Sequence, residues 1–71
     1  MHVKVIEVIP RLFKKSKQVI LKDDAIDLII TPAKNDVVFI DDVRYKVLQR
    51  DIIIRKNLEN QRITLFVEKL Y

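Results

Sequence analysis

Residues 35–47 read NDVVFIDDVRYKV, and this stretch decides the fold. Apolar and polar side chains alternate on both sides of Asp41 and Asp42, which is typical of a β-hairpin with a two-residue turn. With this turn, Ile40 lies opposite Val43. A shift of one residue would scatter the apolar groups over both faces, so the pattern fixes the pairing. Because side chains alternate between the faces of a strand, the predicted core face of the hairpin comprises Val38, Ile40, Val43, Tyr45 and Val47.

The opposite face of this hairpin is a candidate binding surface, since the same pairing places Phe39 directly across from Arg44. An exposed aromatic ring beside cations can stack on nucleic-acid bases or pair with carboxylates. In the alternative interpretation, the first strand or residues 10–17 cover Phe39, and Arg44 lies along the ring. We define the candidate partner or nucleic-acid face as Val37, Phe39, Arg44, Lys46 and Arg50.

The rest of the chain also favours strands. Val, Ile and Thr make up nearly a third of the residues, and β-branched side chains suit strands better than helices. Short apolar segments alternate with polar clusters, and no window has the spacing of an amphipathic helix. Pro10 and Pro32 are expected at strand ends, because Pro donates no ladder hydrogen bond. We predict one domain over residues 1–71, with strands near 2–9, 18–22, 25–31, 36–40, 43–54 and 62–70, interrupted at 10–17, 23–24, 32–35, 41–42 and 55–61.

The strand after the central turn cannot keep one set of side chains inward along its whole length. Odd-numbered residues face the core up to Val47, whereas Ile52 and Ile54 are the inward residues further on. The change predicts a bulge or sharp bend within residues 48–51. A strand that bends and contributes to two packed sheets is how small barrels close. The expected partners of the two inward Ile residues on the last strand are Leu65 and Ile63.

The central stretch resembles a hairpin of SH3-like small β-barrels, whose pattern is GD-x-V-x-I-DG-x-x-Y-x-V. This hairpin is common in small bacteriophage virion and accessory proteins, among others. Asn35 and Asp42 stand where the pattern has Gly, and both residue types tolerate left-handed backbone. The resemblance implies an all-β fold, namely a small, strongly bent, antiparallel SH3-like barrel of five or six strands. The matching residues are Asp36, Val38, Ile40, Asp41, Tyr45 and Val47.

A second candidate surface comes from the last hairpin. If Ile63, Leu65 and Val67 face the core, the side chains between them face outward, and soluble monomers seldom leave such an apolar group uncovered. Either the first strand folds over this group within one chain, or a second subunit covers it. A domain of this length buries only about 60% of its unfolded surface, which favours the subunit. The candidate self-association patch is Ile53, Phe66 and Leu70.

The composition leaves little for catalysis. The chain has no Cys and no Gly, so it has no disulfide, no thiolate ligand and no Gly-rich phosphate loop. His2 is its one His and Ser16 its one Ser. Adjacent carboxylates such as Asp41 and Asp42 are typical of turns, where neighbouring side chains point in different directions. We therefore predict a non-enzymatic protein with no catalytic, cofactor-binding or metal site.

The positive net charge of the chain is compatible with a second function. The chain has 14 Lys and Arg residues against 10 Asp and Glu residues, a net charge of +4, which permits attraction to nucleic acid. Acidic residues are interleaved throughout, however, and only five aromatic residues are present, whereas single-strand binders usually present several on one face. We interpret the chain as a protein–protein interaction or assembly module that forms homo-oligomers, in keeping with phage structural or accessory proteins. The alternative is a small basic barrel that binds nucleic acid. We expect it in a bacterial or phage-infected cytoplasm or in a virion, without a membrane-spanning segment.

Overall fold

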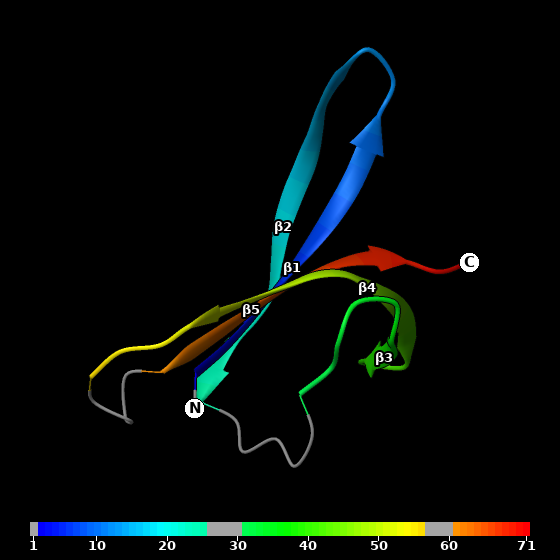
Figure 1. Cartoon of the computed structure of the whole chain (residues 1–71). Helices are drawn as coiled ribbons and strands as arrows, with labels where there is room; N and C mark the ends of the chain where they lie inside the picture. Colours follow the sequence, from blue (N-terminus) through cyan, green and yellow to red (C-terminus); the bar gives the residue numbers. More distant parts are fainter. Residues whose placement is uncertain (1, 26–30, 57–60) are drawn as a thin grey trace.

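The computed structural model describes residues 2–25, 31–56 and 61–71, and these residues form five strands (Figure 1). The strands account for well over half of the chain, and no helix occurs in the ranges that the structure describes. The predicted small all-β fold is therefore confirmed. In chain order the strands are β1 (His2–Arg11), β2 (Lys14–Ala25), β3 (Val37–Ile40), β4 (Val43–Ile53) and β5 (Arg62–Lys69).

The five strands make one sheet in the order β2-β1-β5-β4-β3. Three of the four pairings are antiparallel as expected, but β1 and β5 run parallel. The parallel register places Val3 beside Ile63 and Val5 beside Leu65, so their side chains share one face and all four are buried. The sheet bends strongly, as predicted (Figure 1). It does not close into a barrel among the described residues, because β2 and β3 remain its two edges.

The β3–β4 hairpin has the register predicted from the sequence: Ile40 pairs with Val43, and Phe39 pairs with Arg44. Asp41 and Asp42 occupy the turn with φ angles of 50° and 65°, the left-handed conformation that a tight two-residue turn requires. Asn35 also has a positive φ, and its backbone N–H donates to the carbonyl of Val47 over 2.8 Å. Asn35 and Asp42, which the sequence analysis expected to tolerate left-handed backbone, thus both have a positive φ.

The predicted bulge in β4 lies at Leu48. Val47 pairs with Val67 and Gln49 pairs with Phe66, which leaves Leu48 without a partner on β5. Because two residues of β4 span one residue of β5 here, the faces exchange beyond the bulge.

The predicted partners beyond the bulge were wrong by two residues. Ile52 pairs with Ile63 rather than Leu65, and Arg50 lies opposite Leu65. Ile52 and Ile54, which were expected to face the core, are both exposed, and Ile54 lies beyond the end of β4 at Ile53.

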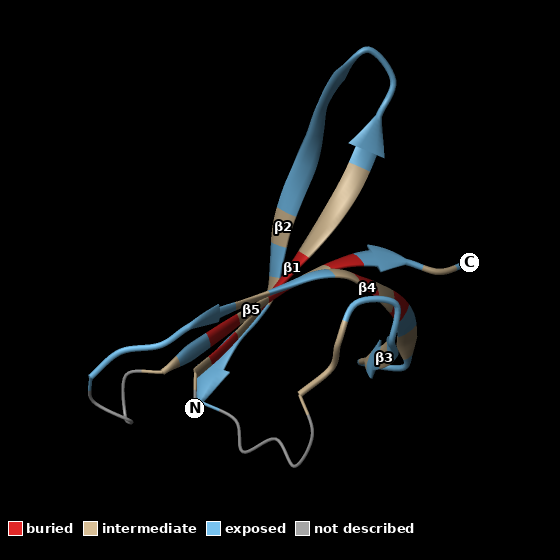
Figure 2. Cartoon of the chain, viewed as in Figure 1, coloured by how far each residue is buried: buried red, intermediate tan, exposed pale blue. Residues whose placement is uncertain are grey.

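The core lies on the three central strands of the sheet, β1, β5 and β4, where the buried residues gather (Figure 2). Its two most deeply buried members, Val47 and Val67, pair with each other across β4 and β5. Four half-buried apolar residues, Leu21, Val38, Ile40 and Val43, pack around it. The buried cluster comprises Val3, Val5, Tyr45, Val47, Ile63, Leu65 and Val67.

The first hairpin is longer than predicted. β1 continues through Pro10 to Arg11, and β2 begins at Lys14, so the expected break at residues 10–17 shrinks to a two-residue turn. Pro10 sits at a register shift between Ile9 and Arg11, where a missing N–H removes no ladder bond. The expected break at residues 23–24 is also absent, because β2 runs to Ala25. The expected strand at residues 25–31 falls mostly on residues 26–30, which lie outside the described residues.

Candidate interaction surfaces

The outer half of the first hairpin projects from the body as a two-stranded arm, which we define as residues 8–18 (Figure 1). The last residue of β1 that pairs with β5 is Glu7, so beyond it β1 and β2 pair only with each other. Leu12 and Phe13 form the turn at the tip, where their side chains are 86% and 102% exposed. Phe13 has a positive φ of 59°, which is strained for a bulky residue. The tip therefore exposes two large apolar side chains to solvent, and the backbone conformation of Phe13 costs additional free energy.

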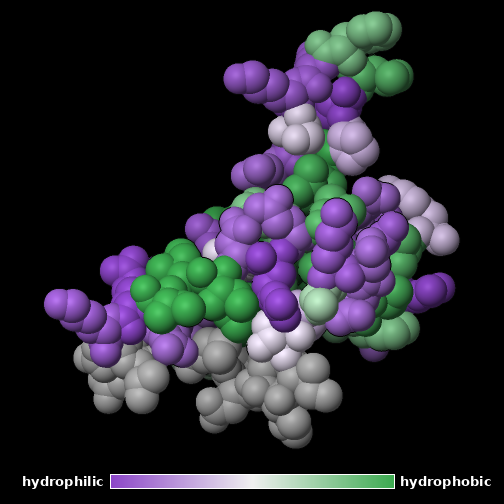
Figure 3. Space-filling model, in the orientation of Figure 1, coloured by the Kyte–Doolittle hydropathy of each residue, from purple (hydrophilic) through white to green (hydrophobic). Residues whose placement is uncertain are grey.

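The arm also carries the whole excess of positive charge. It contains four cations and no acid, while the other ten basic residues of the chain are balanced by ten acidic ones. Arg11 lies directly opposite Lys14, and like charges in such a pair destabilise a sheet. Figure 3 shows the hydrophobic tip beside strongly hydrophilic side chains of the arm. The four cations are Arg11, Lys14, Lys15 and Lys17.

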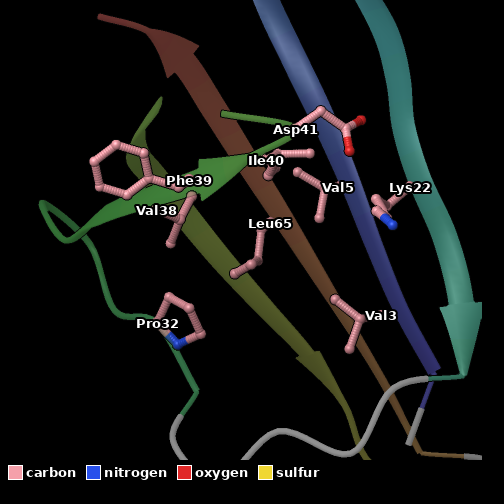
Figure 4. A pocket seen from close by; sticks show the side chains of 9 residues that line it. All are labelled: Val3, Val5, Lys22, Pro32, Val38, Phe39, Ile40, Asp41 and Leu65. Atoms are coloured by element: carbon pink, nitrogen blue, oxygen red, sulfur yellow. The ribbon is translucent and has the colours of Figure 1, made fainter. Parts of the chain in front are cut away.

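A groove of about 490 Å³ opens on the core face between the sheet edges β2 and β3. These two edge strands do not pair with each other, and the floor of the groove consists of the buried residues Val3, Val5 and Leu65. Figure 4 shows side chains from β1, β3 and β5 converging on it, and Lys22 and Asp41 are the charged residues among its lining. The apolar side chains that point into the groove are Val3, Val5, Val38, Ile40 and Leu65.

The predicted partner face is only partly assembled. Val37, Phe39, Arg44 and Lys46 share the face of the β3–β4 hairpin that points away from the core, and Phe39 is 68% exposed. Arg50 does not join them. It lies opposite the buried Leu65, because the bulge at Leu48 moves it to the other face of the sheet.

The predicted self-association patch is spread along one face. Phe66 sits mid-strand and is half-buried beside Ile6, with which it pairs across β1 and β5. Ile53 pairs with Arg62 near one end of β5, and Leu70 follows the other end, where its N–H donates to the carbonyl of Arg44 over 2.9 Å. The three side chains thus share a face without forming a single contiguous cluster. A shallow hollow lies against Phe66, lined also by Val8, Gln18, Leu48 and Gln49.

Two titratable groups are tuned by their surroundings. The His2 imidazole donates a hydrogen bond through Nε2 to the Asp23 carboxylate, and this bond lowers the pKa of Asp23 below its ordinary value of 3.8. Burial raises the pKa of the Tyr45 hydroxyl above 10.0. Among the described residues no three His, Asp or Glu side chains come together as metal ligands. Ser16 lies on the exposed arm, far along β2 from Asp23.

In comparisons with known proteins, no family model, no curated protein and no solved structure matches the chain. In the parts that the structure describes, no helix is long and apolar enough to cross a membrane. Sequence reasoning missed the arm and the groove. The arm does have a sequence signal, an apolar Leu12-Phe13 pair flanked by cations between two alternating segments.

Proposed function

We propose that this chain is a non-enzymatic protein–protein interaction and assembly module that self-associates. The observation that carries the proposal is the projecting arm with its bare Leu12-Phe13 tip. A two-stranded hairpin by itself is only marginally stable in water, and exposed apolar groups of this kind mark interaction sites. A partner that binds the tip would remove Leu12 and Phe13 from water, whereas the isolated chain leaves both exposed.

The setting follows from the resemblance of residues 35–47 to the hairpin of SH3-like phage barrels. It supports a structural or accessory role in a virion or in bacterial cytoplasm. The non-enzymatic part of the proposal is supported by a composition with one His, one Ser and no Cys or Gly.

Sedimentation velocity at tens of micromolar tests self-association. We expect the parent chain to sediment with a mass above one chain, and Phe13→Asp to return it to a monomer. Ile54→Asp is the matched control, since Ile54 is also exposed but lies at the end of β4 on the body. Phe66→Asp examines the predicted patch on the last hairpin, and dissociation by this variant alone would assign the interface there. A parent chain that stays monomeric would overturn the proposal.

One observation favours a second function, binding of nucleic acid. Four cations lie on a two-stranded ribbon, and a ribbon of this kind fits the major groove of B-DNA. Phosphate contacts would make the affinity fall steeply with salt, whereas a largely apolar contact between proteins would respond weakly. Salt dependence therefore separates the two functions.

A further inference from the structure

We propose that two copies of this chain pair along the outer edges of their β2 strands, antiparallel and around Val19, so that one sheet continues across both copies. This inference rests on the proposed self-association and names the strand that carries it. The charges of β2 select a second copy as the partner, because this strand is basic near its beginning and acidic near its end.

β2 is a long and exposed edge strand. It is the outermost strand of the sheet and pairs with β1, and ten of its twelve residues are exposed (Figure 2). Among the described residues, no backbone hydrogen bond outside the sheet ladders involves β2, although the Lys15 carbonyl accepts one from the Arg11 side chain. Sheets that avoid pairing with other chains usually keep their edge strands very short. An edge of this length is a template to which another strand can add.

The charges of β2 complement each other when the strand meets a reversed copy of itself. Lys14 and Lys15 lie at its beginning, and Asp23 and Asp24 lie near its end. In an antiparallel pair centred on Val19, Lys14 comes opposite Asp24 of the second copy, and Lys15 comes opposite Asp23. Each of these pairs occurs twice because of the two-fold axis, and opposite charges across two strands stabilise a sheet. Lys residues on an edge normally discourage pairing, but in this register they meet acids.

Neighbouring registers fit less well. The two-fold axis must pass through a residue of β2, since side chains that are directly opposite share a face of the sheet. With the axis moved one residue toward the beginning of β2, Lys14 meets Lys22, and like charges in such a pair are destabilising. With the axis moved one residue toward the end, Lys17 and Asp23 form the only kind of opposite-charge pair. The register around Val19 therefore joins the most opposite charges and places no like charges directly opposite.

The backbone of β2 is regular where this axis passes. Residues 17–20 pair with β1 in unbroken register, and the two register shifts lie on either side of them. Bulges bend a strand and thereby blunt an edge. The pairs nearest the axis therefore fall on the part of β2 that is free of bulges.

The same register brings the tip of the arm to the second copy. Phe13 directly precedes Lys14, so its place in the register is beside Ala25 of the second copy, one residue beyond Asp24. Pairing along β2 would thus bring a second chain to the exposed Phe13 ring, which is the observation behind the proposed self-association.

Charge reversal tests the register. Lys14 and Asp24 are both exposed, so Lys14→Asp and Asp24→Lys should each leave the fold intact. Each variant alone opposes like charges at two places in the dimer, and we expect it to associate about 5- to 30-fold more weakly than the parent. An equimolar mixture of the two variants places Asp opposite Lys at both places, and it should form a one-to-one dimer about as tightly as the parent. Lys17→Asp is the matched control, because it changes the net charge equally but lies opposite Leu21, and its association should stay close to that of the parent.

The outcomes separate this inference from the proposed function. Sedimentation velocity should give the parent the mass of two chains, because a two-fold contact is closed. If the parent associates but the mixture is no tighter than the single variants, pairing around Val19 is wrong and self-association stands. If the parent itself is monomeric, both fail. Circular dichroism of each variant verifies that it is folded.

Crosslinking supplies an independent measurement, because the chain has no natural Cys. Residues directly opposite in antiparallel strands have Cβ atoms about 4.5–5.5 Å apart, whereas diagonal neighbours are about 7–8 Å apart. Under mild oxidation, Val19→Cys chains should therefore couple to each other faster than Gln18→Cys chains do. Gln18→Cys chains should instead couple readily to Ile20→Cys chains, which lie opposite them in this register. Equal self-coupling of the Val19→Cys and Gln18→Cys chains would contradict pairing around Val19.

Discussion

Replacing Tyr45 by Ala should destabilise the fold more than any change on the surface of the same hairpin. The Tyr45 side chain is only 7% exposed and belongs to the buried cluster, where it pairs with Val38 across the β3–β4 turn. Removing a buried aromatic ring costs about 3–5 kcal/mol. We expect about 3 kcal/mol, the lower end of that range, because the groove beside β3 gives the site room to relax.

This loss is large for so small a domain. Stabilities of about 0.05–0.15 kcal/mol per residue give roughly 4–10 kcal/mol for a chain of this length. Domains of this size lose about 4–8 °C of Tm per kcal/mol, so Tm should fall by about 12–24 °C. Because the proposed self-association would add apparent stability, the comparison belongs in the Phe13→Asp background, with thermal and urea melts followed by far-ultraviolet circular dichroism.

Two controls isolate the ring. Tyr45→Phe keeps the ring and should melt close to the parent. Phe39→Ala removes a ring of similar size from the exposed face, where surface changes stay within about 0.5 kcal/mol. Equal losses for Tyr45→Ala and Phe39→Ala would refute the assignment of the two faces.

The remaining predictions concern pH and salt. Because its folded-state pKa is lowered, the Asp23 carboxylate contributes stability that is complete above the ordinary pKa of 3.8 and is lost as pH falls through the folded value. The stability difference between the parent and Asp23→Asn should therefore close in acid, and a difference that persists down to about pH 2 would contradict the role of the His2 contact. We expect no tight complex with DNA or RNA. A sub-micromolar complex at physiological salt, lost when Lys14, Lys15 and Lys17 are changed to Glu, would favour the nucleic-acid binder.

Local patterns predicted the central hairpin and its bulge, because both depend on neighbouring residues. The turn at Asp41 and Asp42 fixes the register, and the change of inward parity near Leu48 reveals the extra residue. The parallel pairing of β1 with β5 has no such local signal. It depends on which edge the first strand meets, and this is decided by the burial of Val3 and Val5 against the last strand.

The candidate surfaces also include some features with a local sequence signal and others without one. The pairing of Phe39 with Arg44 followed from the hairpin register, whereas the displacement of Arg50 depended on the exact place of the bulge. The sequence analysis missed the arm because Pro10 and the Lys-rich segment after it resemble a loop. Pro interrupts a strand only where its N–H would have bonded, and that depends on the partner strand. The groove depends on whether two edges far apart in sequence meet.

Local features of the arm conflict with the stability of an isolated chain. A bulky Phe13 takes a positive φ, two cations oppose each other across the ribbon, and two large apolar side chains stand in water. Each of these features costs free energy. Among the described residues, the Arg11 Nε–H donates a hydrogen bond to the Lys15 carbonyl over 3.0 Å, whereas Leu12 and Phe13 stay exposed. Sequences whose local choices agree with the fold elsewhere usually depart from that agreement at functional sites. A binding partner that covers the tip would offset the cost of exposing Leu12 and Phe13, and its binding would stabilise a domain that has no disulfide to support its small core.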